Sequence, residues 1–240
     1  MAAQRLKLVA PSGNRVDVDL PASPGVSSIA ASVRFVGGSY GTGFQIGPRG
    51  YHDFACTYVA PATLRERIVV HGREVVIAEA NDKQSSVATL IGAYHELMTV
   101  FAGPAPKRDR VAALFGALKV QDHVDGMAVQ PQSATLLDNA VENIVVVVKS
   151  RGTLNIPGPR QARALTPAHA GARTAHGEVW KTNLSEAEHT VDSAMQGYLL
   201  GFPAGVAELH LANKADSGSA SEATLLGWLN EINVAWRAAA

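Results

Sequence analysis

Hydrophobic and polar residues alternate through most of the first 81 residues, which is the pattern of half-buried β-strands. In residues 15–20, Val16, Val18 and Leu20 alternate with charged side chains. Residues 5–10 precede them across the turn Pro-Ser-Gly-Asn, and residues 66–80 read as a second hairpin with His-Gly at its tip. Short turns between successive strands favour antiparallel pairing. Residues 1–81 are therefore predicted to form a β-rich region, either a sandwich or a small barrel.

Residues 53–60 continue this alternation. Phe54, Cys56 and Tyr58 recur at every second position, so the segment is predicted to be a strand with these three side chains on one face. Cys56 is then expected to be a small buried hydrophobic residue.

After Asn81 the apolar residues recur at helical spacing. The predicted apolar helix faces lie in residues 87–101, 111–118, 137–148, 191–202 and 225–236. The β-branched run at 144–148 suits a strand equally well and leaves the end of the third helix ambiguous. Residues 151–173, which are rich in proline, glycine and arginine, are predicted to be one long loop. Residues 82–240 are thus expected to be mainly helical and to share one core with residues 1–81, giving an α+β fold.

Charge and cysteine content narrow the possible functions. The chain has 240 residues with 21 basic and 21 acidic side chains, so no net charge favours binding to nucleic acid or to a membrane. Cys56 is the one cysteine, which excludes an internal disulfide and a cysteine-based metal site. The first residues lack the apolar stretch of a signal peptide, and no apolar run is long enough to cross a bilayer. These features predict a cytoplasmic or virion protein without cofactor or metal.

The segment Gly37-Gly38-Ser39-Tyr40-Gly41 follows an apolar strand and resembles the nucleophile elbow of the α/β-hydrolases. The resemblance implies that Ser39 attacks an acyl group. It also implies that the acid is Asp122 or Asp192 and that the base is His176, His189 or His210. That fold needs a helix after the serine, whereas three glycines and a proline follow here. Ser39 is therefore assigned to a glycine-rich loop, and a serine hydrolase is kept as the alternative function.

A role without catalysis is the interpretation that the sequence favours. The 144–148 run and the tryptophan-containing C-terminal segment offer apolar area for other subunits, and zero net charge lowers repulsion between copies. The predicted function is that of a structural protein that binds copies of itself in a larger homo-oligomeric particle, of the phage or virion type. The residues predicted as possible contacts for nucleic acid or a partner are Arg151, Arg160, Arg163 and Arg173.

Overall fold

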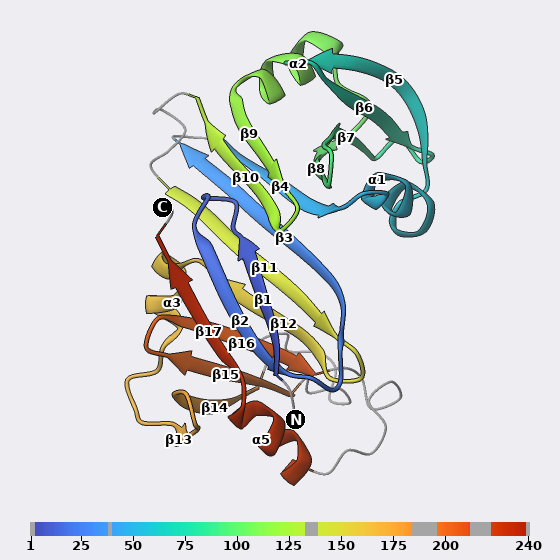
Figure 1. Ribbon diagram of the computed structural model, residues 1–240. Coiled ribbons are helices and arrows are strands. Elements are labelled where there is room, and N and C mark those ends of the chain that lie inside the picture. Colours follow the sequence, from blue (N-terminus) through green and yellow to red (C-terminus); the bar gives the residue numbers. More distant parts are fainter. Residues whose placement is uncertain (1–2, 38–39, 133–138, 184–195, 212–221, 239–240) are drawn as a thin grey trace. The chain divides into compact units, whose positions relative to one another are not determined.

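The computed structural model describes the chain except for residues 1–2, 38–39, 133–138, 184–195, 212–221 and 239–240 (Figure 1). The described residues divide into two compact units. Unit 1 comprises residues 1–8, 14–29 and 143–240, and unit 2 comprises residues 9–13 and 30–142. Three strands, β1 (Ala3–Val9), β3 (Val26–Gly37) and β11 (Asn139–Val148), each run from one unit into the other.

Unit 2 is built around an antiparallel sheet with the strand order β3-β4-β8-β7-β6-β5. The strands that lie wholly in this unit are β4 (Tyr40–Pro48), β5 (Ala62–Val70), β6 (Arg73–Ala80), β7 (Ser85–Ile91), β8 (His95–Ala102), β9 (Leu118–His123) and β10 (Gly126–Pro131). The helix α1 (Tyr51–Phe54) and the π-helical turn η1 (Ala55–Val59) connect β4 to β5, and α2 (Arg108–Gly116) precedes the β9–β10 hairpin.

The core of unit 2 lies on one face of this sheet. The rings of Phe35 and Phe115 pack edge-on against Phe44, with centroids 6.2 and 5.9 Å away. Phe115 and Val111 belong to α2, so the apolar side of that helix closes the core against the strands. This burial is the main stabilising contribution of α2, since a helix of nine residues is marginal by itself.

Unit 1 contains an antiparallel sheet with the strand order β13-β14-β15-β16-β12-β11. Its further strands are β12 (Gly152–Pro157), β13 (Ala172–Arg173), β14 (Glu178–Asn183), β15 (Gln196–Phe202) and β16 (Gly205–Leu211), while β2 (Arg15–Pro21) pairs with β17 (Asn233–Arg237). Its helices are α3 (Pro159–Leu165) and α5 (Glu222–Asn230).

The predicted α+β class is wrong, because 58% of the described residues lie in strands and 17% in helices, with no helical C-terminal part. Residues 85–102 form the strands β7 and β8, and residues 139–148 form β11. Residues 87–101 were predicted to be a helix because side chains on both faces of these strands are buried. Ala88 and Leu90 face the core, and Thr89 is buried on the opposite face. A strand covered on both faces loses its alternation.

Other expectations for residues 82–240 are corrected in part. Residues 151–173 are not one loop, since they contain β12, α3 and β13. The helix expected at 111–118 exists as α2, and the C-terminal helix ends at Asn230 before β17 begins. The helix predicted over 191–202 is a strand from Gln196 onward, and its first residues lie outside the described part of the chain. No helix within the described ranges has the length and apolar character needed to cross a membrane.

Candidate functional site

The α1–η1 segment lies on the face of the unit 2 sheet opposite the core. Thr89 occupies this outer face, and its hydroxyl lies 2.9 Å from Nδ1 of the buried His52. The hydroxyl of Tyr51 donates to Oε1 of Gln45 on β4, at 2.7 Å. The carboxylate of Glu96 on β8 accepts hydrogen bonds from the backbone amides of Gly50 (3.0 Å) and His52 (2.7 Å). These contacts fasten the start of the segment to β4, β7 and β8.

The other side of this segment is an exposed apolar surface. Phe54, Tyr58 and Val59 are 53%, 76% and 70% exposed, and Leu64, at the start of β5, is 50% exposed. The Phe54 and Tyr58 rings contact each other with centroids 5.4 Å apart. We call Phe54, Tyr58, Val59 and Leu64 the apolar face. Residues 54–64 contain no charged side chain, and the exposed polar side chains of this stretch are Thr57, Thr63 and the hydroxyl-bearing Tyr58.

The prediction of a strand at residues 53–60 is wrong. Phe54 and Tyr58 are four residues apart, which places them on the same side of a helical turn as readily as on one face of a strand. They are exposed, whereas Cys56, expected in the core, is only half-buried. The backbone amide of Ala60 donates to Ala55, and the segment then leaves the helical conformation before Pro61.

Cys56 and His52 lie together but do not form an activated nucleophile. The Sγ atom lies 3.7 Å from Nε2 and 3.9 Å from Nδ1, so it sits beside the ring and is not directed at one nitrogen. Burial raises the pKa of the Cys56 thiol and lowers the pKa of His52, which favours the uncharged form of both groups. A catalytic thiol needs the opposite shift. The pair therefore packs the helix against the sheet.

The residues predicted for a serine hydrolase are not brought together by the described structure. Ser39, Asp192 and His189 lie outside the described residues. Asp122 bonds instead to His95, with Oδ1 2.9 Å from Nδ1, and its Oδ2 accepts the backbone amide of Tyr94 at 2.8 Å. This contact fixes the β7–β8 turn, and local sequence patterns cannot indicate it because the partners are 27 residues apart.

The remaining histidines of that set belong to unit 1. His176 is exposed, and His210 lies on β16 with a buried Nε2 that has no hydrogen-bond partner among the described residues. Asp122 belongs to unit 2, where its carboxylate is bonded to His95 and Tyr94. The hydrolase alternative thus stays a prediction about Ser39, and its test is labelling of Ser39 by a phosphonate probe.

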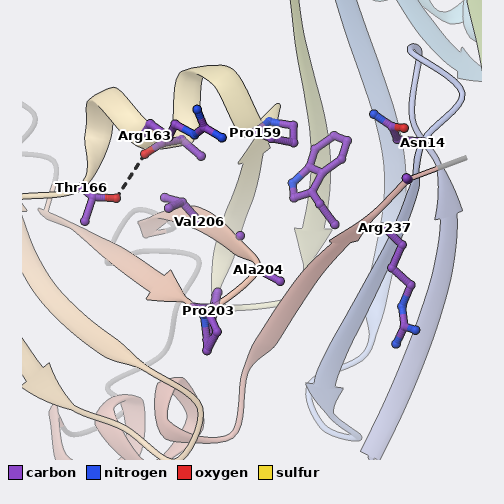
Figure 2. A pocket seen from close by; sticks show the side chains of 13 residues that line it. Asn14, Pro159, Arg163, Thr166, Pro203, Ala204, Val206 and Arg237 are labelled. Carbon is purple, nitrogen blue, oxygen red and sulfur yellow. Dashed lines mark hydrogen bonds between the residues drawn. The ribbon is translucent and has the colours of Figure 1, made fainter.

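Unit 1 contains a pocket of about 510 Å³ beside α3. Figure 2 shows its walls: Arg163 on α3 and Thr166, which directly follows α3, lie across from Ala204 and Val206 of the β15–β16 hairpin. The indole of Trp236 on β17 also lines it. Most of the lining is aliphatic, aromatic or proline, and no acidic side chain belongs to it among the described residues.

The four predicted contact arginines have different surroundings. The Arg151 guanidinium lies 5.8 Å from the ring centroid of Trp228 on α5, in a cation–π contact. Arg160 and Arg163 are exposed on α3, and Arg163 lines the pocket. Arg173 is exposed on β13. A shared surface for nucleic acid is not evident from these placements, and contact with nucleic acid remains a prediction.

Comparison with known proteins identified no relative of this chain. The sequence matches no family model, and neither a curated protein nor a solved structure matches the chain. Within the described ranges, no group of three or more histidine, cysteine or acidic side chains is arranged to hold a metal ion. A proposal for function therefore has to rest on the residues of the chain itself, chiefly the apolar face and the pocket.

Proposed function

We propose that the protein is a non-enzymatic structural component that assembles with copies of itself into a homo-oligomeric particle, of the kind from which phages and other virions are built. The observation that carries this proposal is the apolar face of unit 2. The largest apolar patch on a soluble monomer is about 300–600 Å² and is often functional, so a face of this kind is a candidate contact surface.

The size of the apolar face suits the centre of an interface. Phe54 and Tyr58, at their 53% and 76% exposure, present roughly 250 Å² if a whole aromatic side chain offers about 200 Å². Val59 and Leu64 bring the total to roughly 400 Å². A stable dimer of standard size buries about 800 Å² on each partner, with an apolar centre inside a polar rim. The apolar face could therefore form the apolar centre of an interface and supply about half of the area that each partner of a stable dimer buries.

The edge of the sheet favours contact through side chains and disfavours strand-to-strand pairing. β5 is the last strand of the unit 2 sheet. Its register with β6 shifts between Leu64 and Glu66, and the edge carries Arg65 and Arg67 on either side of Glu66. A bulge and charged residues on an edge strand discourage backbone pairing with another chain. Assembly is therefore expected to use the apolar face.

The net charge of the chain does not oppose association with a second copy. With 21 basic and 21 acidic residues, two copies have no net charge with which to repel each other. Burying the face in an assembly removes about 10 kcal/mol of unfavourable apolar hydration per copy at 25 cal/mol per Å², before the cost of association. This gain is large enough to support a stable contact.

The test is the absolute mass of the protein by light scattering across a dilution series. We expect a defined mass several times the 25.2 kDa of one chain. Val59→Lys should lower this mass, whereas Val124→Lys should not; both valines are 70% exposed in unit 2, but Val124 lies in the β9–β10 turn. A wild-type mass of one chain at every concentration, or equal behaviour of the two variants, would overturn the proposal.

A further inference from the structure

The unit 1 pocket has the size and wall chemistry of a site for a small molecule. Its volume of about 510 Å³ lies within the range of about 300–1,000 Å³ that is usual for such sites. Trp236, Phe202 and Val206 provide apolar walls. The Trp236 Nε1 atom is buried, so the indole contributes apolar surface and no accessible donor. Such a pocket selects a ligand with an apolar body.

The pocket has two charged side chains, Arg163 and Arg237, and only Arg163 has no ion pair among the described residues; its other polar side chains, Asn14 and Thr166, are uncharged. Arg237 also lines the pocket, but its Nε bonds to Asp17 at 2.7 Å, and in Figure 2 its side chain extends away from Ala204 and Val206. Arg163 is exposed and has no ion pair among the described residues. The pocket therefore combines apolar walls with one uncompensated positive charge at its edge.

We infer that this pocket binds a small organic acid, with the carboxylate on the Arg163 guanidinium and the apolar body between Trp236 and Val206. A guanidinium matches a carboxylate through two parallel N–H···O bonds, which gives both affinity and orientation. Thr166 does not compete for the acid as a donor, since its hydroxyl donates to the Ala162 carbonyl at 3.2 Å. The inference is independent of self-assembly, because the apolar face belongs to unit 2.

The experiment compares two probes of the same shape by calorimetric titration. 1-Naphthoate carries the carboxylate, and 1-naphthamide is its neutral counterpart. We expect naphthoate to bind in one-to-one ratio and at least ten times more tightly than the amide. Arg163→Gln should abolish this preference and leave the weak binding of the amide, whereas Arg173→Gln, at another exposed arginine of unit 1, should leave the preference intact.

A second variant tests the place of binding. Ala204→Trp introduces an indole into the pocket and should abolish the binding of both probes. Equal affinities for the acid and the amide would overturn the inference. It would also be overturned if neither probe bound saturably to the wild-type protein, or if Arg163→Gln kept the tenfold preference. Light scattering on the same samples reports self-assembly separately, so either proposal can fail while the other stands.

Discussion

Glu96 is the residue on which the position of the α1–η1 segment depends most directly. Its carboxylate is only 5% exposed and receives the amides of Gly50 and His52 at the start of α1. The nearest cation, Arg49, is 4.0 Å away and mostly exposed. Glu96→Gln keeps the shape of the side chain but replaces one acceptor oxygen by an NH₂ group, which cannot accept a hydrogen bond from an amide.

The expected loss in the free energy of unfolding follows from these two hydrogen bonds. A hydrogen bond to a charged group contributes about 1.5–3 kcal/mol, and an amide left buried without a partner costs a similar amount. Glu96→Gln removes one bond and weakens the other, so the free energy of unfolding should fall by about 2 kcal/mol. Glu96→Ala removes both and should cost about 4 kcal/mol. The backbone amides of 51–60 should also exchange with solvent faster, since Glu96 fastens this segment to β8.

Urea unfolding and hydrogen exchange measure these two effects. The matched control is Glu74→Gln, whose carboxylate is 42% exposed and bonds to Arg67 at 2.6 Å on the surface. That change should cost less than about 1 kcal/mol, as exposed ion pairs do. Because the segment carries Phe54 and Tyr58, Glu96→Gln should also lower the assembled mass. If Glu96→Gln destabilised the protein no more than Glu74→Gln, the reasoning about this carboxylate would be refuted.

Two further predictions concern unit 2. Burial lowers the pKa of His52, so below about pH 6.5 the unfolded chain binds a proton before the folded chain does, and stability should fall as the pH drops through that range. His52→Gln should flatten this dependence in urea titrations at pH 7.5 and 5.5, and an unchanged slope would contradict the assignment. Gly126 has φ +147°, and a Cβ there would overlap the Val9 carbonyl, so Gly126→Ala should cost about 3 kcal/mol. Gly72→Ala, at φ +73° with open space around it, is the control and should cost only about 1–2 kcal/mol in thermal unfolding; equal losses would show that the overlap is relieved.

Some strands could be predicted because one of their faces is buried and the other is exposed to solvent. In β2, Val16 and Val18 are buried and the charged residues between them are not, so the alternation in the sequence is the alternation in the structure. The β5–β6 hairpin was predicted from its His-Gly tip, and His71 and Gly72 do have positive φ of 49° and 73°. These are local signals, readable without knowledge of the rest of the fold.

The pocket and the Glu96 contacts could not be predicted in this way. Trp236 and Val206 are brought to α3 by strand pairing between distant parts of the chain, and Arg163 is the one pocket residue that the sequence analysis names as a possible contact. Glu96 meets the amide of His52 across 44 residues. No periodicity within a short window records such contacts, because they depend on the order of strands in a sheet.

The mistaken strand at residues 53–60 and the proposed assembly have the same physical origin. Between Phe54 and Leu64 the chain has no charged residue, and its exposed polar side chains are only those of Thr57, Tyr58 and Thr63. The described structure turns Ala55 and the half-buried Cys56 toward the sheet, and this leaves Phe54, Tyr58 and Val59 exposed. Burying those three instead would expose the side of the segment that carries Cys56 and His52, and His52 now contacts Thr89. A segment of this composition at the surface of a unit therefore needs a cover from outside that unit, and a second copy of the chain can supply one.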